Sequence, residues 1–297
     1  MNSFKMTLAA AAVAMGGCTA ESSVNLPTRE MGPETQVGDA RVGTYAEFDA
    51  TGAPVAIGVR FSEVALETFP TEMGDKHHCF DKNGDGQMQH DTECMATHER
   101  VIPLPTLAAR RPDMPFKWVL FNWNPMGHMP PGIYDLPHFD VHFYMEPIEN
   151  IMAIETGPCG PEFVRCDQFE TARKPLPPNF MPPDYQNFDA VAPAMGNHLL
   201  DVTSSELHGD RFKRTYIYGT YDGRMIFQEE MITNEFLASR PDTCFTVKQP
   251  AAFAQAGYYP SQSCARYNAS DSTYSVSLEG FGYSEATVPL PIETAGM

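Results

Sequence analysis

Within the segment GIYDLPHFDVHFYMEP, residues 132–147, polar and apolar side chains alternate strictly from His138 to Glu146. From residue 138 the even positions are polar or ionisable, namely His138, Asp140, His142, Tyr144 and Glu146. The odd positions are Phe139, Val141, Phe143 and Met145. A period of two in residues that favour strands predicts a β-strand over 136–146. We expect its odd face to pack in a core and its even face to line a polar cavity.

Two hairpins are predicted from similar patterns. ARVGTYAEF and PVAIGVRF flank the turn-rich DATGAP, and RTYIYGTY and RMIFQEEMI flank Asp222-Gly223. The Asp-Gly pair is typical of a type I′ turn, whose two central residues have positive φ angles. Residues 116–123 and 270–290 are further strand candidates. The sequence therefore predicts a mainly β fold of antiparallel sheets, arranged as a sandwich or a barrel-like structure.

Helical periodicity extends over no more than about ten residues at any point of the chain. Residues 62–69 are predicted to form one or two helical turns with Ser62 as N-cap, and 234–240 a short helix capped by Asn234. Six prolines in 174–193 indicate an extended connection. It would join two halves, about 38–173 and 194–297, of a single β-rich domain spanning 38–297.

The N-terminus resembles an export signal. Lys5 precedes an apolar run too short to span a bilayer, and Met15-Gly16-Gly17-Cys18 resembles the lipobox of bacterial lipoproteins. We expect residues 1–17 to be the signal peptide, Cys18 to be the lipidated first residue of the mature protein, and 18–37 to be a flexible linker. The alternative is an ordinary signal peptide cleaved nearby. Both place the protein outside the cytoplasm, and lipidation would anchor it to a membrane of the cell envelope.

The chain carries a formal net charge of −18. Such an acidic protein is a poor partner for nucleic acid and for an anionic membrane surface, so a lipid would be its only membrane anchor. The charge suits solubility or the binding of cations. The sequence contains no G-x-S-x-G, no H-E-x-x-H and no glycine-rich phosphate loop, so no nucleophile or phosphate site is indicated.

The cysteines predict disulfides. Six remain after Cys18, an even number in an exported chain. Sequence alone allows 15 pairings. The short-range set is favoured, because the members of each pair share one Gly-, Pro- or Asn-bearing segment: Cys79–Cys94, Cys159–Cys166 and Cys244–Cys264.

A calcium-like loop lies inside the first of these pairs. Asp81, Asn83, Asp85 and Gly86 have the spacing of the first half of a calcium loop, and Gln87 could contribute its backbone carbonyl. Position twelve is Thr92, where a bidentate Glu is expected, so Asp91 or Glu93 would have to complete the shell. No flanking helices are evident, which excludes an EF-hand. Calcium binding is the prediction, and an Asx-rich surface turn is the alternative.

The histidine segment is a second candidate metal site. On a strand His138 and His142 lie about 13 Å apart, so one ion can use Asp140 with either histidine but not with both. The remaining ligands would come from His128, from His198, or from Glu229 and Glu230. Imidazole and carboxylate suit zinc, iron or manganese, and nearby Met126, Met129 and Met145 would suit copper. The alternative is a set of hydrogen-bonded histidines packed among aromatic residues.

Three longer strings carry a family resemblance: WVLFNWNPMGHMPPGIYDLPHFDVHFYM, MGNH, and YIYGTYDGRMIFQEEMIT. Over roughly residues 38–240 the chain resembles a family of uncharacterised secreted bacterial proteins, typified by a sigma-E-regulated protein of Thermus. The resemblance implies a β-rich fold and ring-shaped homo-oligomers, and it implies no particular activity.

These observations predict a disulfide-stabilised envelope lipoprotein with a binding or structural role. It would bind calcium, and the histidine segment is the candidate site for a second metal. The alternative is a metal-dependent enzyme, similar to cupins in ligand chemistry, whose site includes His128, His138, Asp140 or His142, and His198. A catalytic metal needs an open coordination position, whereas a structural metal site is closed.

Overall fold

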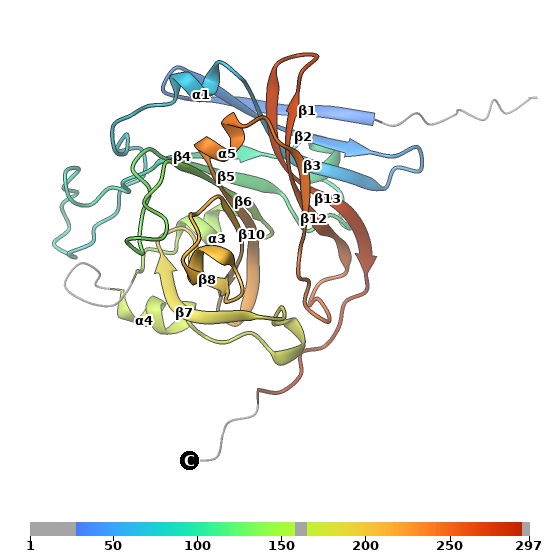
Figure 1. The fold of residues 1–297 in the computed structure, drawn as a ribbon. Coiled ribbons are helices and arrows are strands. Elements are labelled where there is room, and N and C mark those ends of the chain that lie inside the picture. The colour runs from blue at the N-terminus through green and yellow to red at the C-terminus, as the bar shows by residue number, and fades with distance from the viewer. Residues whose placement is uncertain (1–27, 158–164, 293–297) are drawn as a thin grey trace, which may run out of the picture.

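The computed structural model describes residues 28–157 and 165–292, and two antiparallel sheets dominate it (Figure 1). The six-stranded sheet has the order β1 (Thr28–Val37), β2 (Ala40–Phe48), β3 (Pro54–Ser62), β13 (Thr273–Ser284), β12 (Gly257–Asn268) and β11 (Asp242–Thr246). The seven-stranded sheet has the order β4 (His98–Pro103), β5 (Trp118–Asn124), β6 (His138–Tyr144), β10 (Arg224–Thr233), β9 (Arg214–Tyr221), β8 (Gly196–Asp201) and β7 (Tyr185–Ala192). The mainly β prediction is confirmed, as a sandwich-like arrangement rather than a closed barrel.

The helices of the described residues are short and lie in the connections. They are α1 (Ala65–Thr68), α2 (Thr106–Ala109), α3 (Ile148–Met152), α4 (Cys166–Ala172) and α5 (Asn234–Ala238), with 3₁₀ turns η1 (Pro178–Phe180) and η2 (Ser205–His208). The N-cap of α5 is Thr233, whose hydroxyl accepts a hydrogen bond from the backbone N–H of Phe236, rather than the predicted Asn234. Ser62 ends β3 instead of capping α1, which follows Val64.

Both predicted hairpins are present. β2 pairs with β3, and β9 pairs with β10 around Asp222 and Gly223, which have φ angles of 53° and 70°. Those two positive angles are what a type I′ turn requires. The strand predicted over 136–146 is also present, although β6 is limited to 138–144.

Two segments predicted as connections contain strands. Residues 28–37, assigned to the linker, form the edge strand β1, and 185–192 of the proline-rich segment form the edge strand β7. Edge strands pair through backbone groups on one side only, so neither needs a continuous apolar pattern. Pro33 in β1 lies where the register shifts between Met31 and Glu34, a position at which an edge strand tolerates proline.

Each sheet combines strands from both predicted halves of the chain. β3 pairs with β13 in one sheet, with Ser62 opposite Thr273, and β6 pairs with β10 in the other. The larger hydrophobic cluster contains residues of both sheets, among them Phe139, Val141 and Phe143 from the odd face of β6. We call the surface of the seven-stranded sheet that carries these residues its inner face.

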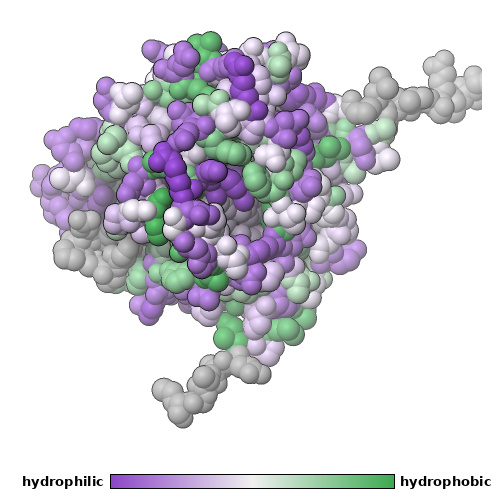
Figure 2. Space-filling view, viewed as in Figure 1, coloured by the Kyte–Doolittle hydropathy of each residue, from purple (hydrophilic) through white to green (hydrophobic). Residues whose placement is uncertain are grey.

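The opposite surface of the seven-stranded sheet, its outer face, is covered as well. A second apolar cluster includes Trp118 and Tyr144 from the strands, Ile151 of α3, and Tyr134 and Phe212 from connections. Consequently every residue of β5 and β6 is buried, including the polar residues of the even face of β6. The exterior, by contrast, carries many hydrophilic residues on the side shown in Figure 2.

Disulfides Cys79–Cys94 and Cys244–Cys264 are formed, as predicted. The third predicted pair includes Cys159, which lies outside the described residues, as do the signal peptide (1–17) and Cys18. Disulfides are typical of oxidising, extracytoplasmic compartments. Within residues 28–157 and 165–292, the helices are all too short or too polar to cross a membrane.

Candidate metal centre

The register of the seven-stranded sheet places polar residues in adjacent rows on its outer face. Asp140 of β6 lies opposite Asn122 of β5 and Met231 of β10. In the next row, His142 lies opposite Leu120 and Glu229. Because side chains two residues apart on a strand point to the same face, the two rows are neighbours.

The first set of ligand atoms is the rim triad, which consists of His128, His138 and Asp140. The Nε2 atom of His138 lies 3.1 Å from Oδ1 of Asp140, and Nε2 of His128 lies 3.3 Å from Oδ2. His138 and Asp140 are buried in β6, whereas the His128 side chain, which comes from the connection between β5 and β6, is 40% exposed. The rim triad therefore connects the buried sheet face with solvent.

The second set consists of His142, His198 and Glu229. We call it the inner triad because it is more deeply buried than the rim triad; like the rim triad, it lies on the outer face of the sheet. The Nε2 atom of His142 lies 3.4 Å from Oε1 of Glu229, and Nε2 of His198 lies 3.9 Å from Oε2. The three residues come from the strands β6, β8 and β10. The side chains of His142 and Glu229 are almost completely buried, and that of His198 is 14% exposed.

All four histidines are oriented in the same way. The Nδ1 atom lies at hydrogen-bond distance from a backbone carbonyl: Met129 for His128, Leu136 for His138, Leu120 for His142 and Ala190 for His198. A carbonyl oxygen only accepts, so Nδ1 carries the proton in each neutral ring and Nε2 keeps its lone pair. Fixing Nδ1 in this way is how proteins commonly orient histidine ligands of metals.

Several ligand-type atoms of the two triads have no hydrogen bond to the described residues. Among the described residues, Nε2 of His138, Oδ1 of Asp140 and Oε2 of Glu229 are buried without a hydrogen-bond partner. Buried polar atoms are normally satisfied, because leaving one unpaired costs about 1–3 kcal/mol. Lone pairs of two acceptors that face each other attract a cation between them.

The separations are close to those between ligands of one ion in each triad, although the His198–Glu229 pair of the inner triad is longer than the tetrahedral value. Tetrahedral coordination with bonds of about 2.0–2.1 Å puts neighbouring ligand atoms about 3.3–3.4 Å apart. The nitrogen–oxygen distances are 3.1 and 3.3 Å in the rim triad and 3.4 and 3.9 Å in the inner triad. Each triad supplies three protein ligands, so one position of a four-coordinate ion stays open in each.

Electrostatics differ between the triads. Without a metal, burial would raise the pKa of Asp140, but His138 and His128 in their protonated forms would hold it well below its usual range, and Asp140 in turn offsets burial and raises the pKa of His128. A metal ion would replace these protons and leave the rings neutral. In the inner triad, burial lowers the pKa of His142 to about 3 and that of His198 to about 4, and it raises the pKa of Glu229 well above its usual range. A metal ion would displace the Glu229 proton, since metal ligands bind in their deprotonated forms.

Other polar groups of the predicted face do not join the triads. The Tyr144 hydroxyl donates a hydrogen bond to the carbonyl of Ala194, and its ring stacks on Trp118. Glu146 lies beyond the strand and pairs with Arg224. Met145 packs against the inter-sheet core, and Met126 and Met129 are exposed.

Sequence reasoning missed supporting residues of the triads. The amide Nδ2 of Asn124 donates to Oδ2 of Asp140, and the ring of Tyr134 lies edge-on to His128 at 6.0 Å. Burial and the charges of Glu206 and Glu229 raise the pKa of Tyr134, which keeps its phenol protonated. Asn124 follows Asn122 at the period of two, which is the signal that could have identified it.

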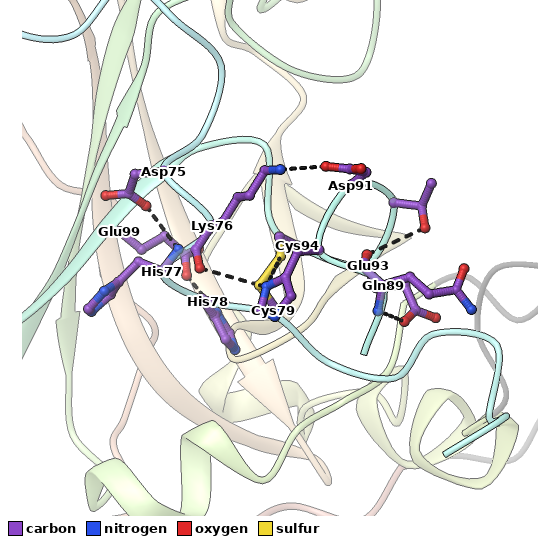
Figure 3. Close-up of a disulfide and its surroundings, with 12 residues drawn as sticks. Asp75, Lys76, His77, His78, Cys79, Gln89, Asp91, Glu93, Cys94 and Glu99 are labelled. Carbon is purple, nitrogen blue, oxygen red and sulfur yellow. Dashed lines mark hydrogen bonds and ion pairs between the residues drawn. A yellow bond between two sulfur atoms is a disulfide. The ribbon is translucent and has the colours of Figure 1, made fainter. Parts of the chain in front are cut away.

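The calcium-like loop lies beside the Cys79–Cys94 disulfide (Figure 3). The Asp81 carboxylate accepts hydrogen bonds from the backbone N–H groups of Gly84, Asp85 and Gly86. The buried Glu93 carboxylate accepts two more, from Asn83 and Gln89, and Asp91 pairs with Lys76. Gln87 donates its backbone N–H to Asp85. Calcium binding by this loop stays a prediction.

Two further groups of ligand-type atoms include the cysteine pairs, with His90 beside Cys79–Cys94 and Glu279 beside Cys244–Cys264. Their sulfur atoms are already bonded to each other. A disulfide offers no thiolate, which is the form of cysteine that binds metals.

Comparison of the chain with protein-family models, with curated proteins and with solved structures returned no match.

Proposed function

We propose that this protein is a lipid-anchored protein of the cell envelope that binds a divalent transition metal on the outer face of its seven-stranded sheet. The disulfides are in keeping with export, and the lipobox-like Met15-Gly16-Gly17-Cys18 supports the anchor. Its principal role is binding rather than catalysis.

One observation carries the metal proposal. Four histidines donate Nδ1–H to backbone carbonyls and direct Nε2 at two buried carboxylates. A histidine kept only for stability gains most by donating to the carboxylate directly. Here the Nε2 lone pairs of the histidines face the carboxylate oxygens instead. A cation bound between the two acceptors stabilises this arrangement.

The donor set defines the class of metal. Imidazole nitrogen with carboxylate oxygen suits zinc, iron and manganese, whereas calcium and magnesium prefer oxygen ligands alone. The case for copper is weaker than the sequence indicated, because Met145 packs against the core on the other side of the sheet.

A metal-dependent enzyme with cupin-like ligand chemistry is the second candidate. It is favoured by the count of three protein ligands in each triad and by the exposure of His128, because a catalytic ion needs an open, reachable position. One pocket of the described residues, lined in part by Met145, Phe180, Phe253 and Tyr259, includes none of the four histidines and so adds no support to the enzyme.

Elemental analysis of the purified mature protein tests the proposal. We expect at least one equivalent of zinc, iron or manganese after dialysis, removed by a chelator and restored by the same ion. Protein that neither contains nor takes up such an ion would contradict it. Exchange of a bound water, measured by relaxation of solvent protons with manganese in the site, separates the enzyme from a closed binding site.

A further inference from the structure

We propose that the rim triad and the inner triad hold two metal ions at the same time and form one two-ion centre. This inference rests on the proposed function and adds the number of ions, their ligands and their order of exchange.

No single ion can be shared by all six residues of the two triads. His138 and His142 are four residues apart on one strand, which separates their Cα atoms by about 13 Å. Each histidine has its own nearest carboxylate oxygen. Asp140 presents Oδ1 to His138 and Oδ2 to His128, and Glu229 presents Oε1 to His142 and Oε2 to His198. The six ligand residues therefore divide into two complete sets of three.

The two sets of ligand residues are neighbours on the sheet. Asp140 and His142 are two residues apart on the same face of β6, so their Cα atoms are about 6.6 Å apart. Glu229 lies opposite His142, diagonally next to Asp140 across the β6–β10 pair. Two ions bound in adjacent rows of one sheet are close enough to interact magnetically.

The charge of the six ligand residues predicts a further ligand at the two ions. Among the described residues, the ion pairs of Asp140 and Glu229 are all with the four histidines. With neutral imidazoles the six ligands carry two negative charges, and two divalent ions would leave a net charge of about +2 in a largely buried place. The open positions should therefore take an anionic oxygen ligand, such as hydroxide, between or beside the ions.

The ions should also exchange at different rates. His128 comes from a connection and its side chain is 40% exposed, whereas the inner triad is supplied by three strands of one sheet. A ligand on an exposed connection can move away without disturbing the sheet. We expect the rim ion to leave first during chelation.

The test is a count of ions in the full mature chain, equilibrated with zinc in millimolar calcium so that the calcium-like loop is filled. Wild type should bind two zinc ions. His128→Gln should lose the rim ion and His198→Gln the inner ion, each retaining one. The control is His77→Gln, an exposed histidine outside both triads, which should bind two. Circular dichroism of the metal-free variants confirms that they fold.

The wild-type count tests the number of ions, and a spectrum tests whether the two ions form one centre. Two ions support the inference. One ion overturns it and leaves the proposed function standing, and no ion overturns both. With two copper(II) ions in place of zinc, we expect the electron paramagnetic resonance spectrum to show dipolar broadening that His128→Gln removes. Two ions without broadening would show separate sites and overturn the single centre.

Discussion

Glu229 and Glu230 are consecutive residues of β10, and each is only 2% exposed, yet their surroundings are opposite in kind. Glu230 belongs to the inner face, where Arg214 donates to both of its oxygens and the hydroxyl of Ser263 donates to one. Glu229 belongs to the outer face, where its neighbours are His142 and His198 and its Oε2 atom has no hydrogen bond among the described residues.

The difference shows how this fold treats a buried charge. On the inner face Arg214 provides a cation and Ser263 a further donor, so the Glu230 carboxylate is fully paired without a ligand. On the outer face Asn124 donates one hydrogen bond to Asp140, but the ion-pair partners of Glu229 and Asp140 in the described ranges are histidines, with no lysine or arginine among them. A buried carboxylate costs free energy unless it is paired, so the missing partner is a proton or a metal ion.

A third carboxylate provides an internal reference. Glu99 of β4 receives a hydrogen bond from Nδ2 of Asn122, and its Oε2 atom lies 2.6 Å from Nδ1 of His78 (Figure 3). This is an ordinary hydrogen-bonded histidine–carboxylate pair. The four histidines of the triads instead direct Nδ1 to carbonyls, which marks them as a different kind of site.

The largest effect is expected when Glu230 is removed. Glu230→Ala leaves the Arg214 guanidinium, whose side chain is 19% exposed, without its carboxylate and should destabilise the protein by about 3–5 kcal/mol, with or without metal. Urea denaturation measures this loss of stability. Glu235→Ala, which breaks a surface pair with Arg211, is the control and should cost less than about 1 kcal/mol. Equal losses of stability in Glu230→Ala and Glu235→Ala would contradict the interpretation of Glu230 as a buried carboxylate that Arg214 requires as its partner.

Glu229→Gln should act through the metal. Burial raises the pKa of Glu229 well above its usual range, which favours the neutral carboxyl when no metal is bound, and the amide is a close replacement for that form. Metal-free stability should therefore change little. Zinc at 100 times Kd should stabilise wild type by about 2.7 kcal/mol per site, and the variant should lose the contribution of one site. Urea denaturation with zinc and with a chelator measures both. A large loss in the chelated protein would make Glu229 a structural residue like Glu230.

The calcium-like loop provides a comparison with an oxygen-only site. Calcium at ten times Kd should raise the stability by about 1.4 kcal/mol, seen as a higher melting temperature. Asp85→Ala should abolish this rise and leave zinc binding at the triads unchanged. An unchanged melting temperature of wild type in millimolar calcium would reject the calcium prediction.

The smallest effect concerns the reference pair. Burial would lower the pKa of His78, but Glu99 more than offsets it and raises that pKa in the folded protein. The native state therefore holds the proton more tightly, and the pair contributes stability that is complete below the unfolded pKa of about 6.5 and is lost as pH rises through the folded pKa. In metal-free protein, His78→Gln should flatten this decline and His77→Gln should not. Urea denaturation between about pH 6 and pH 9 measures the free energy of unfolding of each protein. Identical slopes of this free energy against pH in wild type and His78→Gln would contradict the His78–Glu99 pairing.

Much of the local structure was determined by the sequence alone. The alternation around Asp140 predicted β6, Asp222-Gly223 predicted the β9–β10 turn, and two cysteine pairs within single segments predicted their disulfides. Each depends on a backbone period, a φ requirement or a short loop, which neighbouring residues determine. The distance argument that His138 and His142 belong to different sets also needed only the rise of a strand.

Only the tertiary structure decided which histidine meets which carboxylate. The inner triad joins β6, β8 and β10, and the orientation of His198 depends on the carbonyl of Ala190 in the edge strand β7, within a segment predicted as a connection. Which of Glu229 and Glu230 faces the histidines depends on the β6–β10 register, and a slip of one residue would exchange them. The strand register and the burial of the outer face are set by contacts between segments far apart in the chain. A local sequence pattern contains no information about those contacts.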